Sequence, residues 1–288
     1  MISDFDFNKV SDSRAEYLGP DGEKNHTAVA LTDKAKNVHL LKGECLDVMS
    51  KIAEKYPNGC FDMIFADPPY NLSNGGFTCR SGKMASVNKG QWDKSKGIEL
   101  DYQFTLDWLE LCQRLLKVNG TIWVSGTHHV IFLVGHAMQT HGFKILNQIT
   151  WEKPNPPPNL SCRFFTHSTE TLIWAAKSKK SKHVFNYEDM KAEAGGKQMK
   201  SVWQFTAPTK SEKTFGKHPT QKPLQLLERC IRASTNEGDF VLDPFAGSST
   251  TGVSAVTRGR GYCGIEADEH FIQISKQRLV SAIQKEAN

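Results

Sequence analysis

The chain has 288 residues, of which 39% are hydrophobic and 23% charged, which is typical of a globular protein. Its length is enough for one large α/β domain that carries a smaller lobe, or for two modest domains. It has no run of about 18 apolar residues that could span a membrane, and residues 1–9 lack the basic-then-apolar order of a signal peptide. We therefore expect no membrane association.

The net charge of +5 is unevenly distributed along the chain. Residues 176–222 contain eleven Lys, no Arg and four acidic side chains, so this segment has a charge of +7 and the rest has −2. A basic segment beside a nearly neutral remainder favours a polyanionic partner such as DNA, although a solvated Lys-rich loop would have the same composition. If the segment binds phosphates, charge reversal at several lysines of residues 177–182 should weaken DNA binding and flatten its salt dependence.

Seven cysteines are dispersed along the chain, and none forms a CxxC pair. Their odd number and wide spacing argue against a disulfide framework and favour a reducing compartment, so we expect a cytoplasmic protein. The same spacing argues against structural zinc. His128 and His129 follow a predicted strand without a suitably spaced third ligand, so no metal is expected.

Strand and helix patterns alternate after residues 1–36, which are polar and weakly patterned and which we interpret as an N-terminal extension. Short apolar strands are predicted at residues 38–41, 61–66, 121–124, 143–151, 171–175, 240–242 and 262–265. Amphipathic helices are predicted at residues 46–56, 104–116, 129–141, 223–234, 252–257 and 271–285. Asn119-Gly120 is expected to stop the second of these helices. The alternation predicts an α/β fold with a doubly wound, mostly parallel sheet covered by helices on both faces.

Two segments interrupt this pattern. Residues 71–103 are loop-rich and too long to be an ordinary connection, so they are either functional or mobile. Residues 153–159 contain four prolines and must be extended.

A loop of small residues follows the predicted strand at residues 240–242. It consists of Asp243-Pro244-Phe245-Ala246-Gly247-Ser248-Ser249-Thr250-Thr251-Gly252, and Glu266 ends the next strand 23 residues after Asp243. In doubly wound sheets such a turn lets an adenosine-containing cofactor approach the backbone, and the later acid holds ribose hydroxyls. This loop lacks GxGxxG, GKS and GKT, so a nucleoside without phosphates, such as S-adenosylmethionine, fits best. An ordinary tight strand–helix turn is the alternative interpretation.

The strand at residues 61–66 ends in Asp67-Pro68-Pro69-Tyr70. An exocyclic amine of a nucleobase is a weak nucleophile because its lone pair is delocalised into the ring. Two acceptors for the amine hydrogens, here the Asp67 carboxylate and the Pro68 carbonyl, would restore electron density to the nitrogen. Pro69 keeps the turn rigid, and Tyr70 offers a face on which an extruded base can stack, worth about 1–3 kcal/mol. A turn that only terminates the strand is the alternative.

These residues together resemble the DNA amino-methyltransferases of the circularly permuted class called beta, in which Asp-Pro-Pro-Tyr precedes the cofactor loop. The similarity covers roughly residues 37–280. Three further segments agree with the family pattern: His218-Pro219-Thr220-Gln221-Lys222-Pro223 before the cofactor loop, residues 149–155 near the base pocket, and Gly43-Glu44-Cys45-Leu46 in place of Gly-Asp-x-Leu. Ser249 stands where a second glycine is usual, which we expect to require a negative φ.

The motifs and the resemblance imply a Rossmann-like methyltransferase fold with S-adenosylmethionine as cofactor and DNA as partner. The implied catalytic residues are Asp67, Pro68, Pro69 and Tyr70. The implied cofactor-binding residues are Glu44, Asp67, Thr220, Gln221, Lys222, Asp243, Phe245, Ala246, Gly247, Ser248, Ser249, Thr250 and Glu266. Residues 37–175 and 218–288 are expected to form the catalytic and cofactor-binding domain, with residues 176–217 inserted as a small target-recognition lobe.

A narrower similarity involves residues 73–76, 159–163 and 166–170, which resemble the second adenine methyltransferases of DpnII/MboI-type restriction systems. It implies methylation of adenine in GATC, in duplex or single-stranded DNA, beside a cognate restriction endonuclease. A homodimer is a further expectation that the sequence leaves open.

Several alternatives remain open. Methylation of the cytosine amine needs the same chemistry but more often uses Ser-Pro-Pro-Tyr, so Asp67 favours adenine. Methylation of RNA or of a glutamine amide, where Asn-Pro-Pro-Tyr is commoner, and an inactive DNA-binding regulator are the others. Cys79 lacks the preceding proline of a ring-methylating nucleophile, and we interpret it as an incidental thiol. Trp92, Trp203 and Phe205 either contact DNA or pack within their own segments.

Overall fold

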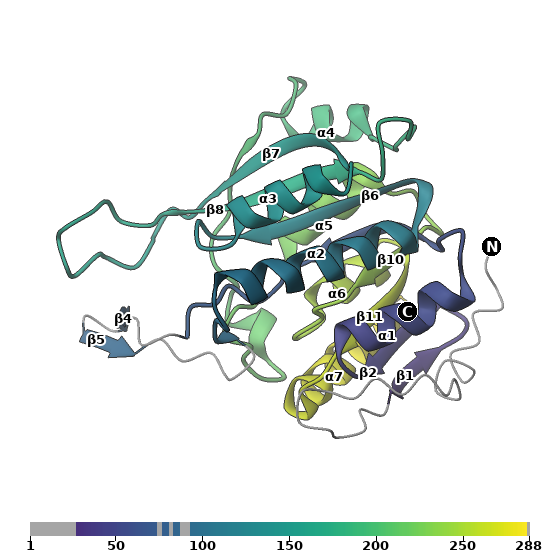
Figure 1. Cartoon of the computed structure of the whole chain (residues 1–288), viewed down its shortest axis with the longest axis horizontal. Helices are drawn as coiled ribbons and strands as arrows, with labels where there is room; N and C mark the ends of the chain where they lie inside the picture. Colours follow the sequence, from purple (N-terminus) through teal and green to yellow (C-terminus); the bar gives the residue numbers. More distant parts are fainter. Residues whose placement is uncertain (1–26, 74–76, 81–82, 87–92, 287–288) are drawn as a thin grey trace.

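The computed structural model describes residues 27–73, 77–80, 83–86 and 93–286 (Figure 1). Residues 1–26 and 74–76 and Trp92, on which predictions were made, lie outside the described residues, as does the side chain of Cys79. No helix in the described part of the chain is long and apolar enough to cross a membrane.

The main sheet has nine strands in the order β1-β2-β11-β10-β3-β6-β8-β7-β9. They are β1 (Ala28–Asp33), β2 (Val38–Lys42), β3 (Phe61–Ala66), β6 (Leu116–Gly126), β7 (Lys144–Glu152), β8 (Thr169–Ala176), β9 (Val202–Gln204), β10 (Phe240–Asp243) and β11 (Gly261–Glu266). A separate antiparallel pair consists of β4 (Phe77–Arg80) and β5 (Lys83–Ser86). The helices are α1 (Cys45–Lys55), α2 (Ile98–Leu115), α3 (Ile131–Thr140), α4 (Tyr187–Glu193), α5 (Leu224–Ser234), α6 (Thr250–Val256) and α7 (Glu269–Glu286), with a short 3-10 helix η3 (Ser211–Lys213).

The centre of the sheet is parallel and buried on both faces. β2, β11, β10, β3 and β6 run parallel, whereas β1 is antiparallel to β2 and β8 is antiparallel to both β6 and β7. Ile64 of β3 packs in the apolar layer under α1–α3, and its neighbours Met63 and Phe65 pack in the layer under α4–α7. Helices therefore cover both faces (Figure 1), which confirms the predicted doubly wound α/β fold.

The ends of β2, β3, β6, β10 and β11 lie along one side of the sheet, which we call the carboxyl edge. β10 pairs with β3 through Val241↔Met63 and Leu242↔Ile64. Asp243 and Asp67 therefore arrive at the same edge although they are far apart in the sequence. Ligands of doubly wound sheets bind at such an edge.

Several boundaries differ from the prediction; α2, for example, begins at Ile98 and not at residue 104. β1 lies within the expected extension of residues 1–36, yet it pairs with β2; as an edge strand it keeps much of its surface exposed, which hid its pattern. Asn119 and Gly120 lie inside β6 and do not stop α2, which ends at Leu115. A Cβ on Gly120 would come within 3.1 Å of the backbone oxygens of the neighbouring strand, so this glycine permits close strand approach instead of helix capping.

Part of the segment expected to form a separate lobe packs on the main sheet. β9 pairs in parallel with β7, and Trp203 and Phe205 are only 5% and 8% exposed. Trp203 packs against Trp123 of β6 at 5.8 Å between ring centres, and Met190 of α4 joins the same core. These aromatic side chains therefore belong to the hydrophobic core and not to a nucleic-acid surface.

Candidate active site

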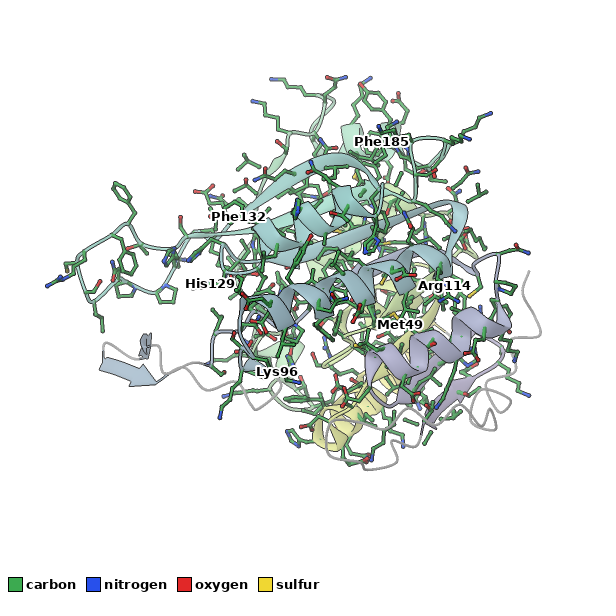
Figure 2. The ribbon with its side chains drawn as sticks, viewed as in Figure 1. Met49, Lys96, Arg114, His129, Phe132 and Phe185 are labelled. Atoms are coloured by element: carbon green, nitrogen blue, oxygen red, sulfur yellow. The ribbon has the colours of Figure 1, made fainter. Side chains whose placement is uncertain are left out.

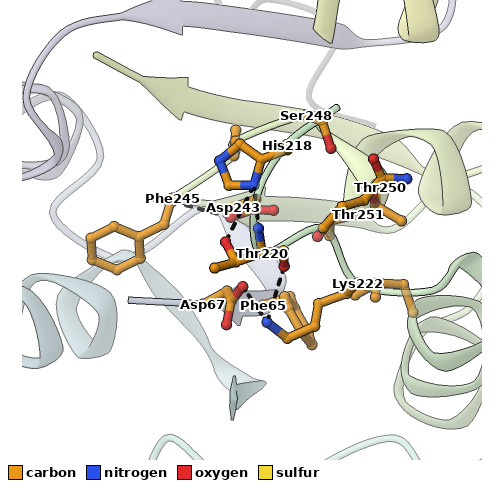
Figure 3. Close-up of a pocket in the computed structure, with 14 residues that line it drawn as sticks. Phe65, Asp67, His218, Thr220, Lys222, Asp243, Phe245, Ser248, Thr250 and Thr251 are labelled. Carbon is orange, nitrogen blue, oxygen red and sulfur yellow. Dashed lines mark hydrogen bonds and ion pairs between the residues drawn. The ribbon is translucent and has the colours of Figure 1, made fainter. Parts of the chain in front are cut away.

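A pocket at the carboxyl edge joins the two motifs singled out in the sequence (Figure 3). The space between its walls, including the part open to solvent, is about 310 Å³. Its lining residues are Phe65, Asp67, His218, Thr220, Gln221, Lys222, Leu227, Asp243, Phe245, Ala246, Gly247, Ser248, Thr250 and Thr251. β3 and β10 bring Asp67 and Asp243 to this pocket, and residues 218–222 reach it from the loop before α5.

The loop between β10 and α6 has a left-handed backbone at two positions. Gly247 and Ser249 both have a φ of +52°, so the expectation of a negative φ at Ser249 is wrong. Such a conformation costs a non-glycine residue about 1–2 kcal/mol. Local contacts hold it here, because the Ser249 amide donates to the Ala246 carbonyl at 2.6 Å and the Tyr262 hydroxyl donates to Ser249 Oγ at 3.3 Å.

Two buried polar residues of α7 hold the same loop, and the sequence analysis missed both. The Ser275 hydroxyl donates to the Gly247 carbonyl at 2.7 Å. Arg278 donates to the carbonyl and hydroxyl oxygens of Ser248 at 2.6 and 2.8 Å, and to the Thr250 hydroxyl at 2.9 Å. Burial lowers the pKa of Arg278 to about 10. Their only signal in the sequence was a polar residue on the apolar face of a helix.

Two carboxylates, Asp243 and Glu266, flank the loop. Asp243 accepts a hydrogen bond from the Phe245 amide at 3.1 Å, and Glu266 accepts from the amides of Gly247 and Asp268 at 2.8 Å each. Burial raises the pKa of both carboxyl groups to about 7. A cationic or hydroxyl-bearing ligand would keep them ionised, so this set of acceptors fits the ammonium group and the ribose of S-adenosylmethionine.

The other residues predicted to bind cofactor fall into two groups. Residues 220–222 line the pocket. Glu44, Ser249 and Glu266 do not line it: Ser249 is buried within the loop, and Glu44 is exposed at the start of α1. The Gly43 amide donates to the Glu266 carbonyl at 3.0 Å, which keeps the ends of β2 and β11 together beside the pocket.

His218 covers one wall of the pocket, although the sequence analysis named it only as part of a motif. Its imidazole lies 3.1 Å from where a Cβ on Gly247 would stand, so a side chain at residue 247 would press against the ring. The ring packs edge-on against Phe271 at 4.2 Å between centres. His218 thus connects the segment before α5 to α7.

Asp67 and Tyr70 face each other after β3. The Tyr70 hydroxyl donates to Asp67 Oδ1 at 2.6 Å and lies 2.9 Å from Ser125 Oγ. Lys222 Nζ donates to Asp67 Oδ2 at 2.5 Å and lies 5.0 Å from the centre of the Tyr70 ring. Lys222 therefore contacts both the carboxylate and the aromatic ring that the sequence predicted to contact the base. Tyr70 is only 5% exposed.

The backbone after Asp67 is anchored by Asp93, a buried residue of the long loop that the sequence analysis did not identify. The Asp93 carboxylate accepts hydrogen bonds from the Tyr70 amide at 3.0 Å, the Leu72 amide at 3.2 Å and the Ser73 hydroxyl at 2.8 Å. Asp93 therefore lies against the catalytic motif and fixes where Tyr70 lies.

Glu170 of β8 is the second carboxylate at the catalytic motif. It forms an ion pair with Lys153 through Oε1, and its Oε2 lies 3.7 Å from Lys222 Nζ. Burial alone would raise the pKa of Glu170, but Lys222 and Lys153 outweigh burial and lower it. Burial raises the pKa of Asp67, and Lys222 offsets part of that rise. Lys153 and Glu170 lay in segments that resembled the family, but neither was singled out.

Three histidines lie at the carboxyl edge beyond β6. The rings of His128 and His129 are 3.9 Å apart, and His128 stacks on His167 at 4.6 Å. Burial and the neighbouring imidazoles lower the pKa of His128 and of His129. Among the described residues there is no group of three or more His, Cys, Asp or Glu side chains that could hold a metal ion.

Known proteins share both the sequence and the fold. A family model described as DNA methylase, covering N6 and N4 methyltransferases, matches residues 61–277. The type II methyltransferase M2.MboI of Moraxella bovis is 52% identical over 243 residues, which cover 84% of this chain and 88% of that protein. M2.LlaDCHI of Lactococcus lactis subsp. cremoris and M2.DpnII of Streptococcus pneumoniae are 56% and 54% identical over 230 residues, which cover 80% of this chain and 86% of each relative.

Two solved structures extend the comparison. The M1.HpyAVI–SAM complex is 28% identical with a TM-score of 0.64, and the match covers 83% of this chain and 98% of that chain. The PvuII cytosine-N4-specific DNA methyltransferase matches with a TM-score of 0.66 over 86% of this chain and 92% of that chain; at 18% identity it shows the shared fold alone. The chain belongs to the N6/N4 family of DNA methylases and is an S-adenosylmethionine-dependent DNA methyltransferase.

Proposed function

We propose that the enzyme methylates the exocyclic N6 amine of adenine in a short DNA site. The observation that carries this proposal is the position of Asp67, which lies on the wall of the Asp243 pocket and accepts hydrogen bonds from an ammonium group and a hydroxyl group. An amine inserted at the same place would donate to this carboxylate and, as its second acceptor, to the Pro68 carbonyl. The rigid Pro69 holds the turn, and Tyr70 supplies the stacking face.

The pocket supplies the complementary half of the reaction. When bound there, S-adenosylmethionine supplies an electrophilic methyl group. We propose that Asp243 holds its ammonium group, that Glu266 and Glu44 serve its ribose side, and that residues 220–222 contact its methionine end. The backbone of residues 245–250, held by α7, lets the cofactor approach closely. The methyl donor and the target amine are thereby held in a fixed relative geometry.

For DNA recognition we propose residues 153–168, the connection between β7 and β8, as the principal element. It extends from the carboxyl edge at the left of Figure 1 and carries the exposed side chains of Phe164 and Phe165, the latter 95% exposed. Asn159 orders its tip, because its amide group donates to the Phe164 carbonyl at 2.6 Å and its oxygen accepts from the Ser161 amide at 3.0 Å. Aromatic groups on a projecting loop suit contacts with exposed or unstacked bases.

We propose GATC as the target, in keeping with residues 159–163 and 166–170 and with the type II relatives. On the same basis we propose that the enzyme works in the cytoplasm beside a cognate restriction endonuclease. A homodimer on DNA is part of this proposal, and light scattering of the protein with and without its DNA site would test it.

One assay tests the base and the target. The protein is incubated with methyl-labelled cofactor and duplexes that contain GATC, GTTC or GACC, and the labelled nucleoside is identified after digestion. N6-methyladenine only in the GATC duplex is the expected result. If the product is N4-methylcytosine, the enzyme methylates cytosine and not adenine. Equal labelling of all three duplexes would reject GATC as the target.

A further inference from the structure

Lys222 occupies the position that the target amine needs. Its ammonium group donates to Asp67 Oδ2 at 2.5 Å, and the same group lies over the Tyr70 ring at 5.0 Å from its centre. An adenine amine would likewise donate to Asp67 while its ring stacked on Tyr70. A lysine ammonium and a base amine are both nitrogen donors, so they compete for one acceptor and one aromatic face.

A second carboxylate is ready to receive Lys222 when it leaves. Glu170 Oε2 lies 3.7 Å from Lys222 Nζ, so a movement of about 1 Å would bring the pair to hydrogen-bond distance. The opposite oxygen of Glu170 is already held by Lys153, which fixes the carboxylate in place. Lys222 lies in the loop before α5 and Glu170 lies in β8, and both side chains are largely buried, at 6% and 11% exposed.

The four charges keep the electrostatic free-energy cost of this exchange small. Asp67, Glu170, Lys153 and Lys222 sum to zero, so moving Lys222 from one carboxylate to the other changes no net charge in the interior. The starting position also has a purpose. Burial raises the pKa of Asp67, and without a cation beside it the carboxyl group would take up a proton and lose acceptor capacity.

We propose that Lys222 is a placeholder for the target amine, which keeps Asp67 ready to accept before the base arrives, and that Glu170 is the positioning residue that takes Lys222 away when the base enters. This inference rests on the proposed role of Asp67 as acceptor of the amine hydrogens. It predicts that base entry and lysine transfer are coupled, so the effects of changing Lys222 and Glu170 are not additive.

The test measures base entry separately from methyl transfer. A duplex that the wild-type enzyme methylates is prepared with 2-aminopurine in place of the target adenine, and its fluorescence reports the extruded base. Glu170→Gln leaves Lys222 on Asp67, so we expect base entry to weaken by about 5- to 150-fold, the usual range for coupled sites. Lys222→Met removes the competing ammonium group. Base entry should therefore be as favourable in the Glu170→Gln, Lys222→Met double variant as in Lys222→Met alone.

The pH profile provides the second readout. With Lys222→Met the transfer rate should fall about tenfold for each pH unit below the pKa of Asp67 and recover at alkaline pH, whereas Lys222→Arg keeps a cation and should retain the wild-type profile. If Lys222→Met does not fold, Lys222→Arg still tests whether a cation at this position gives the wild-type pH profile. Lys285→Met and Glu286→Gln, exposed at the end of α7, are matched controls for loss of a lysine and of a carboxylate.

The outcomes separate this inference from the proposed function. If the wild-type enzyme methylates no adenine, the proposed function fails in the transfer assay before any variant is made. If it methylates adenine but the effects of Glu170→Gln and Lys222→Met simply add, Glu170 does not act through Lys222 and the placeholder inference is wrong. An unchanged pH profile for Lys222→Met would overturn the part that assigns Lys222 to keeping Asp67 ionised.

Discussion

β8 runs from the carboxyl edge to the opposite edge of the sheet, and the segments at its two ends differ sharply. At the carboxyl edge, Thr169 pairs with Glu152, and residues 153–168 project from the sheet beside the catalytic motif. At the other end, Ala176 pairs with Thr121 in the middle of β6, and the Lys-rich residues 177–182 follow there beside the first residues of that strand. The most basic run therefore lies on the side away from Asp67.

The position of residues 177–182 shows that a cluster of charge in the sequence does not locate a binding face. The Lys177 ammonium donates to the Leu116 carbonyl at 2.6 Å, and the Ser181 hydroxyl donates to the Val118 carbonyl at 2.7 Å, which pins the run to the start of β6. From Thr121 to Gly126 that strand covers about 17 Å, at about 3.3 Å per residue, before it reaches the carboxyl edge. The contrast between the two ends of β8 can be tested directly.

Removal of the acceptor at the carboxyl edge should have the largest effect. Asp67→Ala is expected to reduce methyl transfer by about 10²–10³-fold, because a preorganised group that draws density onto the amine is lost. Cofactor affinity, measured by calorimetry, should change little since Asp243 and Glu266 remain. Near-normal turnover of Asp67→Ala would refute the mechanism.

Substitutions in residues 153–168, which project from the carboxyl edge, should have the second largest effect. Phe164→Ala combined with Phe165→Ala should raise the KM for DNA by about 5- to 150-fold, from the loss of stacking worth about 1–3 kcal/mol. Cofactor affinity and the melting temperature should stay unchanged because both side chains are exposed. Phe185→Ala, near α4 at the top of Figure 2, removes an exposed phenylalanine elsewhere and is the matched control. A DNA KM that changed equally in the control would remove residues 153–168 from the DNA face.

Cofactor affinity should depend on pH with a definite sign. The pKa of Asp243 and of Glu266 is raised to about 7, so both carboxyl groups begin to take up protons as the pH falls through that value. Binding of a cationic ligand requires the ionised form, so affinity should be constant above about pH 8 and fall about tenfold per pH unit below 7 for each carboxyl that must lose a proton. Titration calorimetry between pH 5.5 and 8.5 would measure it. Asp243→Asn should flatten part of the slope; an unaltered slope would exclude Asp243 as the coupled group.

The smallest effect is expected at the opposite edge. Reversal of Lys179, Lys180 and Lys182 to Glu should change DNA affinity by less than about twofold and leave its salt dependence unaltered, because these charges lie beyond a Debye length of about 10 Å from the carboxyl edge. The sequence alone predicted the reverse. Binding titrations at several salt concentrations decide between them, since a flatter slope would place this run on DNA after all.

The local chemistry of the site could be predicted from the sequence. The sequence predicted both motifs: the strand end Asp67-Pro68-Pro69-Tyr70 and the loop of small residues after Asp243. Adjacent prolines end a strand, and a small-residue turn with a strand-end carboxylate is typical of a cofactor site. The alternation of buried strands and amphipathic helices likewise predicted the doubly wound sheet, because periodicity reflects burial directly.

Only the tertiary structure decided which distant residues complete that chemistry. Glu170, Asp93, Ser275 and Arg278 join the site through strand pairing, loop packing and the packing of α7, which no local pattern encodes. The left-handed Ser249 depends in the same way on Tyr262, and the burial of Trp203 depends on β9 joining β7. Sequence patterns report how each residue meets its near neighbours, whereas the packing of distant segments determines which charges meet in the interior, and here that packing placed Lys222, from the loop before α5, on Asp67.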